Sequence, residues 1–261
     1  MSSAIRTRGL GFSYGTFRLQ DVCLDIAEGS FVCIAGPNGS GKSTLARLLA
    51  SILTPSGGCV ETAGRTGLVL QNPDNQFVSE IVEDDVAFGP ENLGHESSTI
   101  RREVDNALEQ VQMLCHAKRP VSELSYGQKQ RIGLAGLLAL DPKVLVLDEV
   151  MSMMDNQARR ETLRLIENLK ERGCAVILIT HNMEDAVFSD RLILLRNGKV
   201  VADGKPADIL YDPVAVNGCS LELPFAVSVV QKLEREGVFL GHDILTYKDL
   251  ERRVRAYLLQ N

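Results

Sequence analysis

The chain has 261 residues, of which 44% are hydrophobic, 24% charged and only 5% aromatic, a composition typical of α/β proteins and unlike that of disordered chains. Its net charge of -6 argues against a nucleic-acid partner, because such contact normally needs a basic face that neutralises phosphates. No uninterrupted apolar stretch approaches the roughly 20 residues of a membrane helix, so we expect any role at a membrane to depend on a partner.

Short apolar runs rich in β-branched residues predict the strands, at 30–36, 66–71, 143–149, 174–180 and 191–204. Continuous apolar strands of this kind suit a sheet that helices cover on both faces, so we expect an α/β fold with a mostly parallel central sheet. Between the second and third of these runs the strand signal disappears. The helical spacing of apolar residues in 100–115 predicts an inserted helical subdomain at approximately 76–140.

The end of the chain changes character. The turn-rich stretch 212–218 predicts a joint, and the amphipathic stretches 225–237 and 245–259 predict helices. We therefore expect a main domain over 1–215 and a small C-terminal helical extension over 216–261. Two readings of the extension stay open: its helices cap the core, or they form a permanent dimer contact.

GPNGSGKST (36–44) fits the phosphate-binding pattern G-x-x-x-x-G-K-[ST], follows an apolar strand and opens a helix, which is the context that this motif requires. Backbone N–H groups of such a loop wrap the β- and γ-phosphates, Lys42 supplies a point charge between them, and the Ser43 hydroxyl can ligate Mg²⁺. The predicted nucleotide-binding residues on the loop are Gly36, Pro37, Asn38, Gly39, Ser40, Gly41, Lys42, Ser43 and Thr44.

LVLDE (145–149) is an apolar strand that ends in two acids. Asp148, at the C-terminal end of the strand, lies where a carboxylate can hold Mg²⁺, and Glu149 can accept a proton from an attacking water. Alone, such a pair is often a solvated loop charge. The phosphate-binding loop upstream makes the catalytic interpretation the stronger one.

LSYGQKQR (124–131) predicts the polar opening of a second helix, with Ser125 and Gly127 at its mouth. A helix N-terminus suits an anion, because unpaired N–H groups and the positive end of the helix dipole meet there. The chain thus carries two predicted phosphate-binding helix ends.

The order of these motifs, with Gln71 between the first two, SMMD (152–155) after LVLDE, and then His181, resembles the nucleotide-binding subunit of ATP-binding-cassette (ABC) proteins over roughly residues 1–210. The resemblance implies a P-loop NTPase fold of ABC type with an antiparallel β-rich N-terminal part. It also implies ATP and Mg²⁺ as cofactors. In that family two such domains pair head to tail, and the LSGGQ-type helix of one presses on the γ-phosphate held by the other.

The resemblance assigns a role to each matching residue. Glu149 is the general base, His181 contacts the γ-phosphate, and Gln71 touches both Mg²⁺ and the attacking water. Tyr14 stacks on adenine, although a tyrosine in such a turn is sometimes only packing. The expected metal-binding residues are Ser43, Gln71 and Asp148, and those acting on the partner's nucleotide are Ser125, Tyr126, Gly127, Gln128 and Asp155.

Two departures from the family pattern bear on rate and not on identity. Tyr126 stands where the pattern has glycine, so a bulky side chain lies close to the expected phosphate of the partner. Val150 and Met151 replace the usual small or proline residue and threonine after the glutamate. Because Ser125 and Glu149 are retained, we expect an active ATPase.

QNPDNQFVSEIVEDDVAFGPENLG (71–94) resembles the ATPases of energy-coupling-factor (ECF) importers, which take up vitamins or transition-metal ions, and its QNPDNQ form resembles the first of their two ATPase types. The tail stretches 222–237 and 243–254 are similar to the same family. This implies a peripheral protein at the cytoplasmic face of the membrane. The implied partners are an identical or paralogous ATPase, a transmembrane coupling subunit that docks near 71–94, and a separate substrate-binding membrane subunit.

Other interpretations stay open. The stretch 71–94 could be an acidic surface loop without a partner, although its apolar residues argue against full solvation. The chain could also be a soluble ABC ATPase that remodels ribosomes or DNA, although that class usually needs two cassettes or long coiled coils. A third interpretation, motivated by Tyr126, is a regulatory module that closes on ATP with little turnover.

Overall fold

The computed structural model describes residues 2–219 and 221–259. Its central sheet has six strands in the order β5-β6-β7-β3-β8-β9, and the first five are parallel while β9 runs antiparallel. These strands are β3 (Phe31–Ala35), β5 (Thr66–Val69), β6 (Val144–Asp148), β7 (Ala175–Thr180), β8 (Arg191–Arg196) and β9 (Lys199–Gly204). The predicted mostly parallel sheet is confirmed.

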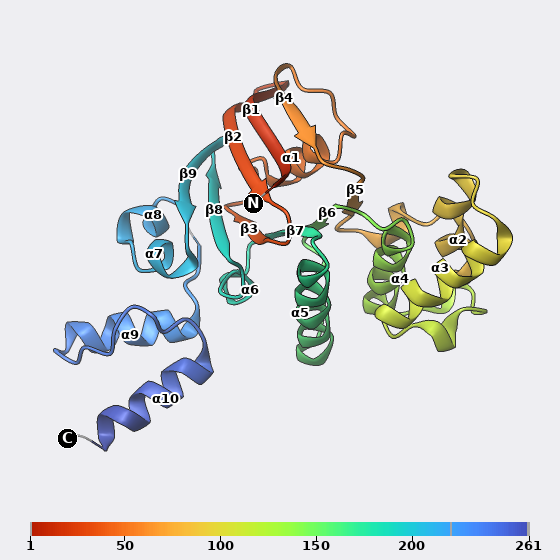
Figure 1. Cartoon of the computed structure of the whole chain (residues 1–261). Helices are drawn as coiled ribbons and strands as arrows, with labels where there is room; N and C mark the ends of the chain where they lie inside the picture. The colour runs from red at the N-terminus through yellow and green to blue at the C-terminus, as the bar shows by residue number, and fades with distance from the viewer. Residues whose placement is uncertain (1, 220, 260–261) are drawn as a thin grey trace.

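A second, antiparallel sheet of three strands in the order β2-β1-β4 forms the N-terminal part of the fold (Figure 1). Its strands are β1 (Ser3–Tyr14), β2 (Phe17–Ala27) and β4 (Gly57–Thr62). The helix α1 (Lys42–Leu49) lies between the two sheets, and its residues Leu45 and Leu48 are fully buried in one hydrophobic cluster with side chains of both sheets. The antiparallel N-terminal part implied by the ABC resemblance is therefore confirmed.

The other face of the central sheet is covered by α5 (Asn156–Glu171), whose Leu165 and Ile166 pack in a second cluster with residues of β3, β6 and β7. Every residue of β3, β6 and β7 is buried, as expected for parallel strands covered on both faces. The sheet is rigid in consequence, and the loops at the C-terminal ends of its strands have a fixed base.

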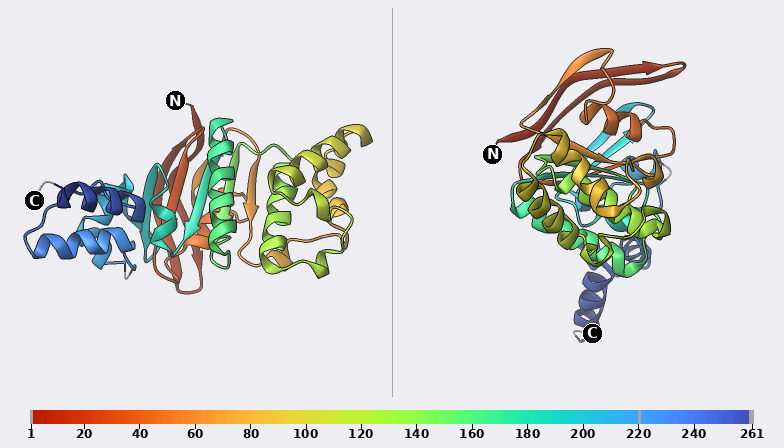
Figure 2. Two further views of the ribbon diagram at one scale, coloured as in Figure 1. Left: turned by 90° about the horizontal axis from the view of Figure 1, so that it is seen from below. Right: turned by 90° about the vertical axis from the view of Figure 1, so that its right-hand side faces the viewer.

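The predicted helical insertion is present at the β5 edge of the sheet (Figure 2). It contains α2 (Val82–Asn92), α3 (Ser97–Gln110) and α4 (Tyr126–Leu138), with short 3₁₀ turns at Pro73–Asn75, Leu114–His116 and Val121–Glu123. The helix predicted over 100–115 ends earlier, at Gln110. Gln112 there adopts a left-handed conformation (φ 58°), and the Met113 N–H donates to the Leu108 carbonyl at 2.8 Å, which closes the helix as a Schellman motif does.

The expected joint at 212–218 is wrong in detail, because most of it is the short helix α8 (Pro213–Asn217). Asp212 accepts a hydrogen bond from the Val214 N–H and Pro213 occupies the first helical position, so the apparent turn signals are those of a helix start. Before it lie α6 (Met183–Ala186) and α7 (Pro206–Leu210), and after it α9 (Phe225–Arg235) and α10 (Tyr247–Leu258).

The C-terminal helices share a hydrophobic cluster with the central sheet. Val227 and Val230 of α9 and Leu250 of α10 pack in it together with Cys33 of β3 and Leu192 of β8. These contacts show that the extension caps the core, and they leave open whether it also contacts a partner. In the described ranges no helix combines the length and the apolar character that crossing a bilayer requires.

This packing predicts the cost of truncating a buried side chain between the last two helices. Ile244 is 1% exposed, whereas Leu258, which is of the same size, is 70% exposed. Ile244→Ala should lower the free energy of unfolding by roughly 2–5 kcal/mol because it removes buried contacts and leaves a cavity. Leu258→Ala should change it by less than about 0.5 kcal/mol. Urea denaturation of the two variants measures both, and equal losses would contradict the packing described.

Candidate active site

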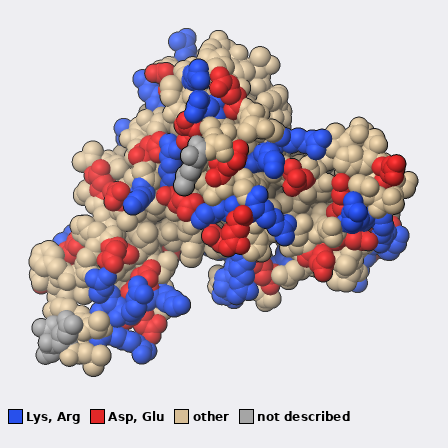
Figure 3. All heavy atoms as spheres, in the orientation of Figure 1, with Lys and Arg blue, Asp and Glu red and all other residues tan. Residues whose placement is uncertain are grey.

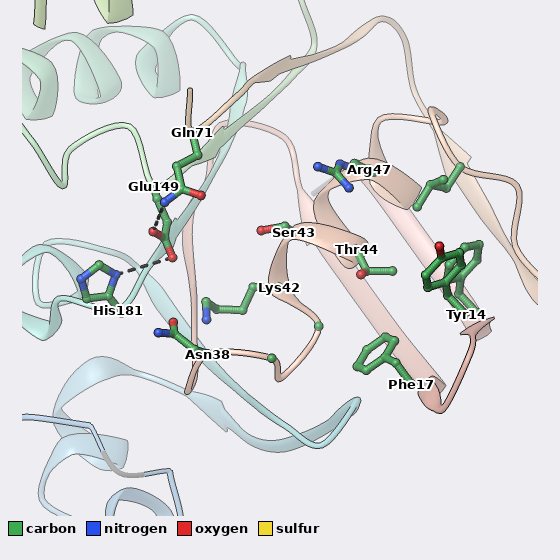
Figure 4. A pocket seen from close by; sticks show the side chains of 14 residues that line it. Tyr14, Phe17, Asn38, Lys42, Ser43, Thr44, Arg47, Gln71, Glu149 and His181 are labelled. Carbon is green, nitrogen blue, oxygen red and sulfur yellow. Dashed lines mark hydrogen bonds and ion pairs between the residues drawn. The ribbon is translucent and has the colours of Figure 1, made fainter. Parts of the chain in front are cut away.

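A cavity of about 1140 Å³ opens where the C-terminal ends of the parallel strands meet the phosphate-binding loop and the turn between β1 and β2. Figure 4 shows Lys42, Ser43 and Thr44 at its centre, Gln71, Glu149 and His181 on one side, and aromatic rings on the other. Segments that lie far apart in the sequence therefore line one pocket.

The phosphate-binding loop connects β3 to α1 and needs glycine at two positions. At Gly36 (φ 156°) an added Cβ would lie 2.0 Å from the Leu195 carbonyl oxygen, and at Gly41 (φ 106°) it would lie 2.6 Å from the ring of Phe17. At Gly36 the backbone of Leu195 leaves no room for a side chain, and at Gly41 the positive φ strains any residue other than glycine. The glycines thus let the loop fold tightly against the sheet.

Lys42 is held inside the loop. Its ammonium donates to the carbonyl oxygens of Gly36 at 2.8 Å and of Pro37 at 3.0 Å, and the residue is 5% exposed. Burial lowers the pKa of Lys42, while the charges of Glu149 and Asp148 oppose that shift. The cation is thus fixed at the mouth of the loop, where a phosphate would be neutralised.

The other loop residues divide by the direction of their side chains. Those of Asn38, Thr44 and Ser43, together with the backbone at Gly39 and Gly41, line the cavity. Ser40 is buried at 2% exposure, and its hydroxyl has no hydrogen-bond partner in the described part of the chain. Ser40 therefore offers a nucleotide only its backbone.

Two oxygen ligands suitable for a metal lie next to each other. The Ser43 hydroxyl donates to a carboxylate oxygen of Asp148 at 3.3 Å, and Asp148 is 4% exposed at the end of β6. Burial raises the pKa of Asp148, and its hydrogen bond to Ser43 and the nearby cations only partly oppose this. Because the negative charge is buried and incompletely neutralised, the pair fits a hard divalent cation such as Mg²⁺.

Glu149 is the centre of a three-residue arrangement. Its two carboxylate oxygens face different partners: the Gln71 side-chain amide donates to one at 2.9 Å, and His181 Nδ1 lies 3.5 Å from the other (Figure 4). Its backbone is left-handed (φ 53°), a conformation of order 1–3 kcal/mol above the ordinary ones, and its N–H donates to the Ile179 carbonyl at 3.0 Å. The structure thus brings together all three predicted catalytic residues.

Tyr14, the last residue of β1, lies at the opposite end of the cavity from Glu149 and is 80% exposed (Figure 4). Phe12 and Phe17 line the same region. An exposed ring on a pocket wall is placed for stacking and not for core packing. The stacking of adenine on Tyr14 nevertheless stays a prediction.

The second predicted phosphate-binding helix end is α4, and it contributes no residue to this cavity. Ser125 caps α4 in a capping box: its hydroxyl accepts from the Gln128 N–H at 3.3 Å, and the Gln128 side chain accepts from the Ser125 N–H at 2.9 Å. At Gly127 no atom lies within 4 Å of an added Cβ, so this end of the helix is open. Any phosphate at α4 must therefore come from outside this chain's own pocket.

Asp155 has a structural role that the sequence did not indicate. It caps α5 by accepting hydrogen bonds from the backbone N–H groups of Gln157 at 2.9 Å and Ala158 at 2.8 Å. These hydrogen bonds lower the pKa of Asp155, and the one from Ala158 has the largest effect. They favour the ionised carboxylate. Asp155 does not line the cavity, and its action on a partner's nucleotide stays a prediction.

Sequence reasoning missed several residues at the site. Arg47 and Leu53 line the cavity beside the phosphate loop, and no motif marks either position. Gln130, buried in α4, donates to the Gln71 carbonyl oxygen at 2.7 Å. The tyrosine at position 126, where the family pattern has glycine, was a sequence signal for contact between α4 and Gln71. The Tyr126 hydroxyl donates to the same Gln71 oxygen at 2.6 Å.

Comparisons with known proteins agree with this geometry, which defines a P-loop ATPase of the cassette type. Residues 19–152 match the family model described as ABC transporter. The chain is 40% identical to the energy-coupling factor transporter ATP-binding protein EcfA1 of Caldanaerobacter subterraneus subsp. tengcongensis, over 96% of this chain and 98% of that protein. It is 41% identical to the corresponding EcfA of Syntrophomonas wolfei, over 90% and 92% of the two chains.

Solved structures give the same result. The structure of cbiO1 from Clostridium perfringens, described as part of the ABC transporter complex cbiONQ, superposes with a TM-score of 0.75 at 30% identity, over 91% of this chain and 98% of that one. A dimeric, post-hydrolysis ATP-binding cassette bound to ADP and Pi superposes with a TM-score of 0.70 at 25% identity, over 77% and 98%.

The chain belongs to the ABC transporter family and, within it, to the energy-coupling factor transporter ATP-binding proteins. Its activity is ATP hydrolysis coupled to transport. Nucleotide binding by the chain follows from this membership, whereas its assignment to this cavity and the part played by each residue are proposals.

Beyond the cavity, Asp185 of α6 lies four residues after His181 and is fully buried. Its Oδ1 atom lies 3.3 Å from Nε of Arg159 in α5. Within the described residues, neither Asp185 Oδ1 nor Arg159 Nε has a hydrogen-bond partner. Burial raises the pKa of Asp185 to about 6, while Arg159 and then a hydrogen bond from Thr180 act in the opposite direction. The carboxyl group of Asp185 is thus buried, and nearby groups stabilise its negative charge only in part.

The raised pKa of Asp185 predicts how stability depends on pH. In the folded state this pKa is about 6, above the ordinary aspartate value of 3.8, so the stability contributed by its protonated form is present below about pH 4 and is lost as the pH rises through 6. The free energy of unfolding of the wild type should therefore fall, relative to Asp185→Asn, by up to ~3 kcal/mol between pH 4 and 7. Urea titrations across this range measure the difference, and a constant difference would contradict the assignment.

Proposed function

We propose that this chain is the ATP-hydrolysing subunit of an ECF-type importer, in which ATP-driven closing and opening of an ATPase dimer powers uptake of a vitamin or metal ion. The observation that carries the proposal is the pairing of two half-sites. A catalytic group around Glu149 lies beside the phosphate loop, and a second phosphate-binding helix end, at Ser125, lies outside that cavity.

The hydrolytic step follows from the residues around the cavity. The loop N–H groups and Lys42 bind the β- and γ-phosphates, and Ser43 and Asp148 would hold Mg²⁺, with Gln71 nearby. The bound cation would neutralise charge that develops on the phosphate oxygens. Glu149 takes a proton from water as the water oxygen bonds to the γ-phosphorus, and the bond from that phosphorus to the ADP oxygen breaks.

Gln71 and His181 orient the Glu149 carboxylate for this hydrolytic step. Gln71 donates to one oxygen of Glu149 and His181 lies beside the other, so the carboxylate cannot rotate freely. A fixed base and a fixed water reduce the entropy that must be lost in the transition state. The products are ADP and phosphate.

A second cassette subunit completes the site. In one chain the phosphate loop, with Glu149 and His181 beside it, faces one side of the nucleotide, and Ser125, Tyr126, Gly127 and Gln128 of a head-to-tail partner would supply donors from the other side. ATP binding thus favours the closed dimer, and hydrolysis favours opening, because closure depends on contacts to the γ-phosphate. The partner is a second copy of this chain or a paralogue.

The surface of the helical subdomain supports docking of a transmembrane coupling subunit. A groove of about 230 Å³ between α2 and α3 is lined by apolar side chains such as Ile100 and by the acids Asp84 and Glu91, while Glu83 in the same lining is paired with Arg101. Apolar side chains on the same subdomain are exposed, namely Val78, Phe88 and Leu93. An apolar groove with an acidic rim fits a cytoplasmic helix that carries a basic residue.

The charge distribution supports the same choice of partners. On the face of the molecule that Figure 3 shows, acidic and basic side chains intermix over the surface. Binding to nucleic acid would instead favour a basic stripe. Similarity to the energy-coupling factor transporter proteins, and not the charge pattern, supports a peripheral location at the cytoplasmic face of the membrane, with a separate membrane subunit that captures the substrate.

The general-base assignment predicts the behaviour of Glu149→Gln. The amide cannot accept the water proton, so ATP turnover should fall by at least about 100-fold, whereas ATP binding through the phosphate loop should persist. Glu171→Gln, an exposed position at the end of α5, is the matched control and should hydrolyse ATP normally. Steady-state hydrolysis and retention of labelled ATP measure the two effects. Unchanged turnover in Glu149→Gln would overturn the assignment and would favour a regulatory module.

The docking groove predicts the effect of reversing one charge. Asp84→Lys should place a cation on the rim and reduce recovery of the membrane subunits with tagged chain by about tenfold, because like charges would then face each other. Glu109→Lys makes the same change at an exposed position of α3 outside the groove and should leave recovery intact. Quantitative mass spectrometry of detergent-solubilised complexes measures both. Equal recovery with the two variants would exclude this groove as the docking site.

A further inference from the structure

Tyr126 is the first residue of α4 and stands where the ABC pattern has glycine. Its side chain makes a specific contact with a distant segment of the chain. Its hydroxyl donates to the backbone carbonyl oxygen of Gln71 at 2.6 Å, across 55 residues of sequence. The residue is 38% exposed. The side chain is therefore engaged with its own chain and does not extend freely over the open helix end.

The same carbonyl oxygen has a second donor from the same helix. The Gln130 side-chain amide donates to it at 2.7 Å and lies 3.4 Å from the Tyr126 hydroxyl oxygen. Gln130 is 1% exposed, so its position is fixed by packing. The two lone pairs of the Gln71 carbonyl oxygen are thus both used by α4.

The contact continues into the catalytic group. The backbone of Gln71 is held by α4, and its side chain donates to Glu149 at 2.9 Å. Glu149 in turn lies 3.5 Å from His181 through its other oxygen. A continuous series of polar contacts therefore runs from the N-terminal end of α4 to the base of this chain's own site.

We propose that Tyr126 is a positioning residue: its hydroxyl fixes the backbone of Gln71 and so holds the Gln71 amide against Glu149. This inference rests on the proposed function in one respect, which is that the N-terminal end of α4 lies against the partner's nucleotide. Binding of nucleotide in the partner's site would then affect the position of Glu149 in this chain's own site. A glycine at the same position has no side chain and cannot make this link.

Tyr126→Phe tests the proposal because it removes only the hydroxyl. Loss of one hydrogen bond to a positioning group should lower kcat for ATP hydrolysis roughly 2–10-fold. The KM for ATP should stay unchanged, because the phosphate loop is untouched. Tyr247→Phe removes a hydroxyl from an exposed tyrosine of α10 and should leave both constants as they are.

A double-mutant cycle separates positioning from a general structural effect. In a Gln71→Ala background the amide that Tyr126 positions is gone, so Tyr126→Phe should lower kcat no further. An equal further loss in that background would overturn the proposal, as would a kcat for Tyr126→Phe equal to that of the wild type. Glu149→Gln, assayed in parallel, tests the proposed function separately: abolished turnover there with no effect of Tyr126→Phe would refute the positioning role alone.

Discussion

The structure depends on one constraint: a γ-phosphate must be neutralised on both sides, and one chain supplies donors on only one side. The loop before α1 and the buried Lys42 form the first half-site, and the open end of α4 forms the second, in a different part of the molecule. Because no described residue of α4 lines that cavity, we propose that a second cassette subunit supplies the other half of the site. Closure then depends on nucleotide, and the chain can act as a motor.

The buried strands of the central sheet place the proposed catalytic groups together at the C-terminal ends of the strands. The phosphate loop, Glu149 and His181 follow the fully buried strands β3, β6 and β7, and fixed strand ends hold them in register. The helical subdomain is joined at the β5 edge (Figure 1), and in the sequence Gln71 lies between the end of β5 and the subdomain. The hydrogen bonds of Gln71 to Glu149 on one side and to α4 on the other therefore connect the proposed catalytic group to the helical subdomain, which also carries the proposed docking groove between α2 and α3.

Much of this was predictable from sequence, for identifiable physical reasons. Buried parallel strands are continuous apolar runs, and the loop GPNGSGKST has few alternatives to a phosphate site, so the central sheet and the Lys42 region follow directly. The end of α3 and the helix α8 were mispredicted because their signals are local: Gln112 in a left-handed conformation looks ordinary in sequence, and Asp-Pro opens a helix as readily as a turn. The contact of Tyr126 with Gln71 joins distant segments, and no periodicity reports it.

Photo-cross-linking tests the central claim most directly. A photoreactive residue would replace Gln128 at the end of α4, in complexes solubilised from membranes, and irradiation would be carried out with and without ATP. The account predicts an ATP-dependent adduct between α4 and the phosphate loop of a second cassette subunit, identical or paralogous, identified by mass spectrometry of the linked peptides. Adducts confined to the same chain, or equal yields with and without ATP, would contradict the claim that the second phosphate-binding helix end serves a partner.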